Sequence, residues 1–149
     1  DYNMLEQVFL NLINNAIDAM KESTEKRLTI RASGKIISEI GYKTGYRYTD
    51  FFRIGEKKIV VEISDTGKGM SKDVQSKIFE PFFTTKSVNE GTGLGLSIVH
   101  MIIERLSGTI DVTSEENKGT TFYVNIQPQI KKVVAEEGQY DKSDQSSGY

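Results

Sequence analysis

Two glycine-rich segments, one of them next to a carboxylate, constrain this chain more than any other feature. The first is Asp65-Thr66-Gly67-Lys68-Gly69, and the second is Gly91-Thr92-Gly93-Leu94-Gly95-Leu96, which leads directly into a helical pattern. Glycine accepts backbone angles that other residues avoid, and the first turn of a helix offers unpaired N–H groups and a positive dipole end. The two segments together predict a nucleotide site with an adenine-binding carboxylate and a phosphate-binding loop. The site is not a P-loop, because the sequence contains no G-x-x-x-x-G-K-[ST] run.

Length and charge exclude several classes of protein. A chain of 149 residues is long enough for one domain with a hydrophobic core. The net charge of −2 gives no sign of a surface for nucleic acid or an anionic membrane, so neither is expected to contact this domain. The absence of cysteine excludes disulfides and thiolate chemistry and fits a cytoplasmic location. The chain starts inside a helical pattern and without methionine, so we interpret it as part of a longer protein, which leaves open a membrane anchor elsewhere.

Apolar periodicity and capping signals predict three helices. A helix is expected over 4–20, with an apolar stripe formed by Leu5, Phe9, Leu12, Ile13, Ala16 and Met20. A short helix is expected after an N-cap at Ser71 and should end near Pro81. An amphipathic helix is expected over 96–106, with Gly108 as its C-terminal stop.

Alternating patterns predict four strands, at 28–32, 59–64, 109–114 and 121–126. The last two are expected to form a hairpin around the turn 115–119. The segment 34–55 is too long for a tight loop, so we expect an extended hairpin or an insertion there. The polar residues 131–149 predict a disordered tail.

Three polar side chains share one face of the first helix. At about 100° per residue, Asn11, Asn15 and Asp18 fall within a ~60° arc, roughly opposite the apolar stripe. Asparagine is a poor residue for the middle of a helix, and an amide oxygen is a hard neutral ligand suited to Mg²⁺ that also binds phosphate oxygens. A merely solvated polar face is the equally weighted alternative.

Other candidate residues follow from their chemistry, and each has a simpler alternative. Asp65, at the end of a predicted strand, could accept a hydrogen bond from an adenine amino group, or it could only form an Asp-Thr-Gly turn. Lys86 follows the aromatic segment 79–83 and could contact a terminal phosphate as a point charge, or it could simply be solvated. His100, the only histidine, is expected to be structural rather than a phosphate acceptor or a metal ligand.

Five motifs in this order resemble the catalytic and ATP-binding domain of a sensor histidine kinase, within the GHKL ATPase superfamily. Segment 11–19 resembles the asparagine box, 65–69 the first glycine box, and 79–86 the phenylalanine box. Segment 91–99 resembles the second glycine box, and 119–122 the terminal one. The resemblance covers about 5–126, so we expect a domain over 1–130, and its nitrogen-regulator-like subgroup is the one that carries Asp18-Ala19 where many members have Lys-Tyr.

The resemblance also implies a role for each site residue. Asn15 would bind Mg²⁺, Asn11 would lie beside the phosphates with a catalytic role, and Asp65 would read adenine. Lys86 would hold phosphate, also with a catalytic role, within an ATP lid over 82–95. The remaining nucleotide-binding residues implied are Asp18, Gly67, Gly69, Met70, Thr85, Gly91, Thr92, Gly93, Leu94, Gly95, Leu96 and Thr120.

The implied fold is a two-layer α/β sandwich of the Bergerat type, in which a mixed, mostly antiparallel sheet lies under three helices. The implied reaction transfers the γ-phosphoryl group of Mg²⁺-ATP to a histidine on a separate helical dimerisation domain. That domain, a downstream response regulator and a second copy of the full-length protein are the implied partners.

Three alternatives remain open. The first is an ATPase motor of the gyrase, mismatch-repair or heat-shock-chaperone kind, and the second is an anti-sigma-type serine kinase. Both usually carry glutamate where Asn11 stands, and Asn11 cannot accept a proton as a general base. The third is a nucleotide-binding module without chemistry. The kinase interpretation is favoured because the expected ligand residues are present.

Overall fold

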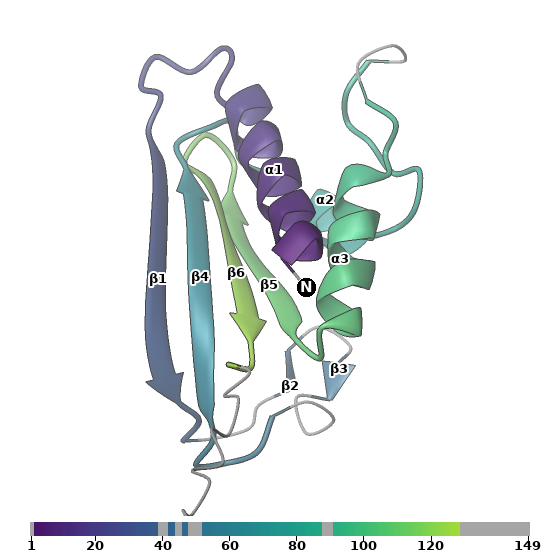
Figure 1. The fold of residues 1–149 in the computed structure, drawn as a ribbon. Helices are drawn as coiled ribbons and strands as arrows, with labels where there is room; N and C mark the ends of the chain where they lie inside the picture. Colours follow the sequence, from purple (N-terminus) through teal and green to yellow (C-terminus); the bar gives the residue numbers. More distant parts are fainter. Residues whose placement is uncertain (1, 39–41, 44–45, 48–51, 88–90, 129–149) are drawn as a thin grey trace, which may run out of the picture.

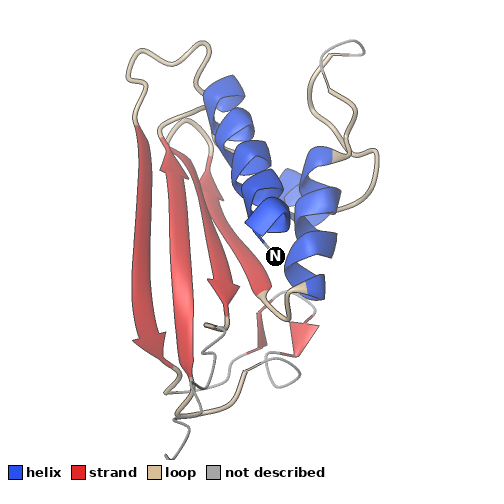
Figure 2. Cartoon of the chain, viewed as in Figure 1, coloured by secondary structure: helices blue, strands red, loops and turns tan. Residues whose placement is uncertain are grey.

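The chain folds into a helical layer packed on one face of an antiparallel sheet. The computed structural model describes residues 2–38, 42–43, 46–47, 52–87 and 91–128. The main strands are β1 (Leu28–Ile36), β4 (Lys57–Asp65), β5 (Thr109–Glu115) and β6 (Gly119–Ile126), and the helices are α1 (Tyr2–Ala19), α2 (Lys72–Lys77) and α3 (Gly95–Arg105). The sheet order is β1-β4-β6-β5, and α1 and α3 lie side by side over one face (Figure 1). Figure 2 shows the two layers directly.

The expected two-layer sandwich is confirmed, with one correction to the sheet. All three strand pairs of the described four-stranded sheet are antiparallel, whereas the resemblance implied a mixed sheet. The short turn between β5 and β6 allows only an antiparallel pair. The two-residue strands β2 (Tyr42–Lys43) and β3 (Tyr46–Arg47) pair with each other in a separate sheet.

The core lies between the sheet and the two long helices. Alternate residues of β4 and β6 face the helices, and Ile63 of β4 pairs in register with Phe122 of β6. The fully buried side chains of the helices come from both α1 and α3. The buried core residues shared by the two layers are Val8, Leu12, Val61, Ile63, Val99, Ile102, Ile103, Ile110, Phe122 and Val124. Burying such side chains stabilises the fold by about 1.5–3 kcal/mol each.

The buried stripe of α1 differs from the predicted one at its start. Leu12, Ala16 and Met20 are buried as expected, but Val8 takes the place predicted for Leu5, which is only half-buried. The buried residues of α1 repeat every four positions, so at about 100° per residue the buried stripe turns gradually around the helix. The face with Asn11, Asn15 and Asp18 is confirmed as partly exposed.

The helix ends show how local chemistry sets the boundaries. The Ser71 hydroxyl accepts a hydrogen bond from the Val74 N–H at 3.4 Å, which confirms Ser71 as the N-cap of α2. At the end of α3 the predicted stop is wrong in one respect, because Ser107 rather than Gly108 adopts the left-handed conformation, with φ of 54°. The N–H groups of Ser107 and Gly108 donate to the carbonyls of Glu104 and Ile103, a Schellman arrangement.

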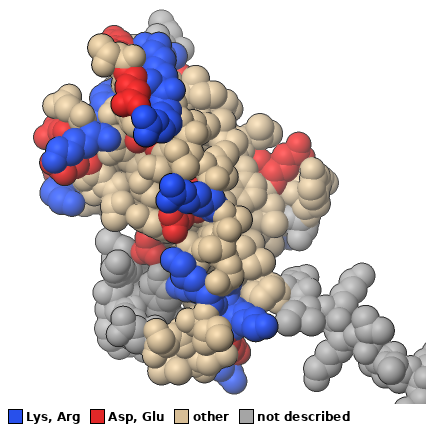
Figure 3. All heavy atoms as spheres, turned by 90° about the vertical axis from the view of Figure 1, so that its left-hand side faces the viewer, with Lys and Arg blue, Asp and Glu red and all other residues tan. Residues whose placement is uncertain are grey.

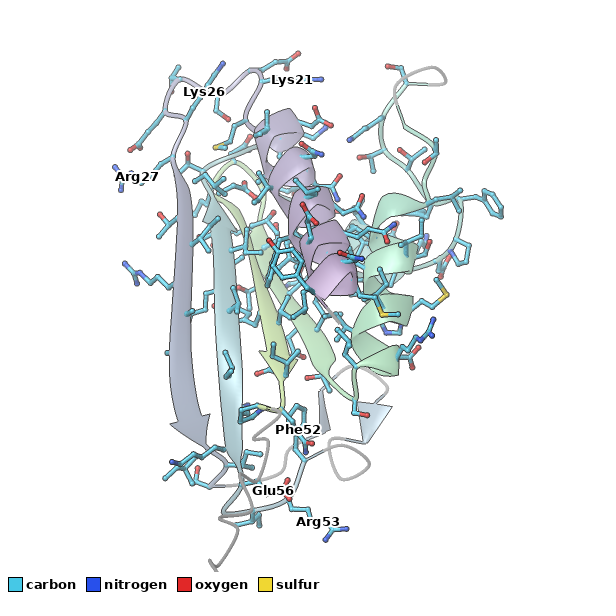
Figure 4. All side chains as sticks on the ribbon, viewed as in Figure 1. Lys21, Lys26, Arg27, Phe52, Arg53 and Glu56 are labelled. Carbon is cyan, nitrogen blue, oxygen red and sulfur yellow. The ribbon has the colours of Figure 1, made fainter. Side chains whose placement is uncertain are left out.

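β1 is longer than its predicted end at Ala32 and runs through Gly34 to Ile36. The chain returns with Phe52, which is 1% exposed and lies under the Lys58 ammonium group at 5.9 Å from the ring centroid. Glu56 then accepts hydrogen bonds from the Arg53 N–H and the Gln127 side chain (Figure 4). The connection after β1 is therefore anchored at its return, while 39–41, 44–45, 48–51 and the expected tail 131–149 lie outside the described residues.

The surface on the β1 side carries charges of both signs close together (Figure 3). Two ion pairs there join Arg27 with Glu25 and Lys35 with Glu62. Within the described ranges, no helix has the length and apolar character needed to cross a membrane.

Candidate functional site

A cavity of about 890 Å³ opens between the C-terminal end of α1 and the ends of β4 and β6. This size is typical of small-molecule sites. Ten of the predicted site residues line it, and they come from five separate segments: Asn15, Asp18, Asp65, Gly67, Gly69, Met70, Thr85, Lys86, Leu96 and Thr120. The fold therefore brings together the first helix, the first glycine segment and the segment that carries Lys86.

Asp65 lies at the buried end of the cavity. It is the last residue of β4, pairs in register with Thr120 of β6, and is 6% exposed. Burial raises the pKa of the Asp65 carboxyl, and the backbone N–H groups of Gly67 and Thr120 oppose this shift in part. The Gly67 N–H donates to Asp65 Oδ1 at 2.8 Å. The chain thus holds the carboxylate in place through backbone N–H groups, and the desolvated carboxylate suits a ligand with an N–H donor.

Gly67 and Gly69 have a packing reason to be glycine, in addition to the predicted approach to a ligand. A Cβ on Gly67 would lie 2.7 Å from the Ala19 backbone, and a Cβ on Gly69 would lie 1.9 Å from the Glu115 carbonyl oxygen. Gly69 also has φ of 63°. The missing side chains let this segment pack between the end of α1 and the β5–β6 turn. The two residues line the cavity, but packing within the chain already requires glycine at both positions.

The two asparagines of α1 lie differently with respect to the cavity. Asn15 lines it, one turn from Asp18. Among the described residues that form the cavity wall Asn11 does not appear, and its Nδ2 donates to the Gln7 carbonyl at 3.0 Å. The Asn11 Oδ1 atom lies 3.4 Å from the point where a Cβ on Gly95 would stand. Asn11 is therefore next to the N-terminus of α3, at the edge of the site.

The N-terminus of α3 carries the second glycine segment. Leu94 is the N-cap residue, and its apolar side chain cannot accept a hydrogen bond, so the first-turn N–H groups remain suited to an anion. The described wall of the cavity includes Leu96 of this segment but not 91–95. Gly93 has φ of 67°, and a Cβ there would lie 2.4 Å from the Phe82 carbonyl carbon, so contact with the segment before it requires this glycine.

Lys86 reaches across the cavity to α1. Its Nζ lies 2.5 Å from Asp18 Oδ2, and Lys21 Nζ lies 2.9 Å from Asp18 Oδ1. The Lys86 and Lys21 ammonium groups hold the pKa of the Asp18 carboxyl below its ordinary value. The Asp18 carboxylate thus lies between two of the lysines that line the cavity.

His100 lies apart from these residues, as expected. Its ring packs against the Phe79 ring with centroids 5.3 Å apart, and its Nδ1 is 3.7 Å from Glu104 Oε2. The described residues that line the cavity do not include it. These contacts fit the structural role predicted for His100.

Sequence reasoning missed part of the cavity wall. The connection between α1 and β1 contributes five of the missed residues. Lys26 Nζ donates to the Lys21 carbonyl within that connection (Figure 4). Thr66 holds this connection in place, because its hydroxyl accepts from the Arg27 N–H and donates to the Glu25 carbonyl. The missed residues are Ala16, Ala19, Lys21, Glu22, Ser23, Thr24, Glu25, Thr66, Lys68, Ser87, Asn117, Lys118 and Phe122. Five of these lie inside the motif segments 11–19, 65–69 and 119–122, namely Ala16, Ala19, Thr66, Lys68 and Phe122, and the others lie outside any motif.

Comparison with known sequences agrees with this geometry. The family described as histidine kinase-, DNA gyrase B-, and HSP90-like ATPase matches residues 1–130. The catalytic domain of histidine kinase ThkA has a similar structure, with a TM-score of 0.56 and 33% identity, over 85% of this chain and 68% of that one. The chain is a histidine kinase catalytic domain of this family.

The sequence relatives of this catalytic domain are sensor kinases. It is 40% identical over 158 residues to the sensor kinase CckA of Brucella abortus, covering 99% of this chain and 16% of CckA. It is also 40% identical over 122 residues to the sensor histidine kinase ZraS of Escherichia coli, covering 82% of this chain and 21% of ZraS. The chain thus spans about a fifth or less of the length of these curated relatives.

Proposed function

We propose that this catalytic domain binds Mg²⁺-ATP and transfers the γ-phosphoryl group to a histidine on a separate helical dimerisation domain of the same protein. The domain would lie in the cytoplasm, and the full-length protein, whose membrane anchoring is left open, would act as a homodimer and pass the phosphoryl group to a response regulator. The observation that carries this proposal is one cavity that brings together Asp65, Asn15 and Lys86. They supply an acceptor for adenine, an oxygen ligand for the metal and a cation for phosphate.

The nucleotide would lie along the cavity with its base at Asp65. A carboxylate that already accepts the Gly67 N–H has a second oxygen for the exocyclic amino group of adenine. The phosphates would then extend toward Lys86 and the N-terminus of α3, which favours anions. Within 82–95, the described residues would form the part of the lid that covers them.

The donor set fits magnesium bound mainly through the nucleotide. In the described part of the chain no cluster of three or more histidine, cysteine, aspartate or glutamate side chains could hold a metal ion alone. Mg²⁺ usually takes one or two protein oxygens together with phosphate oxygens and waters, and Asn15 would provide such an oxygen. The ion, when bound, would neutralise charge that develops on the transferred phosphoryl group.

Asn11 favours transfer to a partner over hydrolysis. It lies beside the N-terminus of α3, where the phosphates are proposed to end, and an amide can orient a group but cannot accept its proton. The proton of the attacking group would then go to a base on the acceptor domain. Lys86 would stabilise the transferred group as a positive charge.

The pair Asp18-Ala19 supports the nitrogen-regulator-like subgroup. Members with Lys-Tyr at these positions are expected to use that lysine on phosphate. Here the position carries a carboxylate, so Lys86 is the cavity lysine proposed to take over that role.

Phosphoryl transfer in trans tests the proposed function. The chain alone, given ATP labelled at the γ-phosphate, is expected to hydrolyse it barely above background and not to label itself, since it lacks the acceptor. Addition of the dimerisation domain from the same protein should give a labelled product that is labile in acid and stable in alkali. Fast hydrolysis by the chain alone, lost on Asn11→Ala, would contradict the kinase assignment and favour an ATPase.

Asn15→Ala is expected to weaken Mg²⁺-ATP binding more than metal-free ADP binding, because the amide oxygen serves the ion. Calorimetric titration with each ligand measures the difference. The matched control is Asn14→Ala, since Asn14 is an exposed residue next to it on α1 and does not line the cavity. An equal loss for both ligands would assign Asn15 a structural role instead.

A further inference from the structure

An acidic side chain lies where the nucleotide phosphates are proposed to bind. Asp18 lines the cavity and uses both carboxylate oxygens, Oδ1 for Lys21 at 2.9 Å and Oδ2 for Lys86 at 2.5 Å. The Asp18 and Lys86 side chains are 30% and 32% exposed, so the pair is partly shielded from water. A carboxylate beside phosphate is unfavourable unless its charge is compensated, and here two ammonium groups compensate it.

Lys86 is held along its stem as well as at its charged end. A Cβ on Gly91 would lie 3.1 Å from both Cβ and Cδ of Lys86, and 2.8 Å from Thr84 Oγ1. The Lys86 N–H donates to Thr84 Oγ1 at 3.1 Å. Gly91 therefore leaves room for the lysine stem, and the local turn directs the side chain toward α1. The absence of a side chain at Gly91 is therefore explained by packing against Thr84 and Lys86.

We propose that Asp18 is the positioning residue that holds Lys86 when no nucleotide is bound, and that it competes with the nucleotide phosphate for Lys86. The proposal rests on the proposed function, namely that this cavity binds ATP. When phosphate takes Lys86, Asp18 keeps Lys21 as its partner, so the exchange leaves no unpaired carboxylate in the site. When the phosphoryl group has left, Lys86 returns to Asp18. Asp18 therefore weakens nucleotide binding and keeps Lys86 in place between turnovers.

The first test uses the domain without nucleotide. In Asp18→Asn, hydrogen exchange of the backbone in 82–87 is expected to be about threefold faster or more, because the ion pair that ties this segment to α1 is lost. Lys86→Met removes the same tie and should give the same increase. Asp73→Asn is the matched control, since Asp73 forms an exposed ion pair with Lys77 on α2 and does not line the cavity. Unchanged exchange in both Asp18→Asn and Lys86→Met would overturn the proposal.

The second test compares ATP affinity in single and double variants by calorimetry. Asp18→Asn is expected to bind ATP about fivefold more tightly, because Lys86 no longer has to leave an ion pair. Lys86→Met should bind ATP more weakly than the wild type. The double variant should have the same affinity as Lys86→Met, because Asp18 and the phosphate can compete only while Lys86 is present. A tightening that persists in the Lys86→Met background would show simple repulsion by Asp18 and would overturn the proposal, as would weaker binding in Asp18→Asn.

The two tests separate this inference from the proposed function. If the wild-type domain does not bind ATP, the proposed function fails, while the exchange measurement on the empty domain still decides whether Asp18 holds Lys86. Equal melting temperatures of the wild type and the Asp18→Asn variant would confirm that the change in hydrogen exchange reports on the Asp18–Lys86 ion pair and not on the stability of the whole domain. A faster exchange confined to 82–87 supports the inference, whereas a uniform increase over the chain contradicts it.

Discussion

Gly69→Ala is expected to destabilise the domain by about 2–4 kcal/mol, the range for backbone strain combined with a steric clash. Gly69 has φ of 63°, and an alanine Cβ would stand 1.9 Å from the Glu115 carbonyl oxygen and 2.7 Å from its carbonyl carbon. Both clashing atoms belong to the backbone, so no rotamer change can relieve the contact. Thermal unfolding should show a melting temperature lower by roughly 10 °C.

Gly34→Ala is the matched control for this substitution. Gly34 lies within β1, and a Cβ there would have no heavy atom of its surroundings within 4 Å among the described residues. Alanine also restricts the unfolded chain more than glycine, so the variant should be as stable as the wild type or slightly more stable. If the two variants melted at the same temperature, the contact between Gly69 and the β5–β6 turn would not explain the glycine.

The parts of the fold that depend on local chemistry could be predicted from the sequence. Ser71 followed by Asp73 predicts a helix start, and the structure places the N-cap at Ser71. The turn at 115–119 predicts the β5–β6 hairpin, and the observed strands meet at that turn. These signals act within a few residues, so no distant contact can change them easily.

The length of β1 could not be predicted in the same way. Residues 33–36 alternate poorly and include Gly34, which is unfavourable inside a strand. They form a strand because β4 pairs with them in register, from Ser33 with Val60 to Ile36 with Lys57. Pairing with a neighbour therefore overrides the local preference of this segment.

The predicted motifs identify the cavity but not the contacts inside it. Asp18 and Lys86 are 68 residues apart in sequence, and no spacing rule predicts their ion pair. The glycines of the first glycine segment show the same limit, since Gly67 and Gly69 contact Ala19 and Glu115 rather than open space. Residues of a motif can be required for packing within the chain, for ligand binding, or for both, and the contacts seen in the structure identify the packing role.

Asp65→Asn is expected to reduce ATP affinity by a factor of roughly ten or more, because a hydrogen bond to a charged group is worth about 1.5–3 kcal/mol. In the wild type the backbone N–H groups of Gly67 and Thr120 bind the Asp65 carboxylate, which has further lone pairs that the adenine amino group would use. Asparagine has one oxygen, so its NH₂ group would face the adenine donor. Calorimetry with ATP and GTP measures the effect, and equal affinities of the wild type for the two nucleotides would contradict the assignment of Asp65 to adenine.

The same substitution is expected to stabilise the empty domain at neutral pH, opposite in sign to its effect on binding. Burial raises the pKa of Asp65 in the folded state, so ionisation of this group opposes folding. The protonated Asp65 side chain contributes fully to the stability of the fold below the unfolded-state pKa, and this contribution is lost as the pH rises through the folded-state pKa. Asparagine does not titrate, so its contribution does not change with pH. The difference in unfolding free energy between Asp65→Asn and the wild type should therefore be largest at neutral pH and shrink in acid. Urea unfolding across this pH range measures the difference in unfolding free energy. A difference that does not change with pH would show that ionisation of Asp65 does not oppose folding.

Opposite signs for the effects of Asp65→Asn on ATP binding and on stability would identify Asp65 as a residue that serves ligand binding and destabilises the nucleotide-free domain.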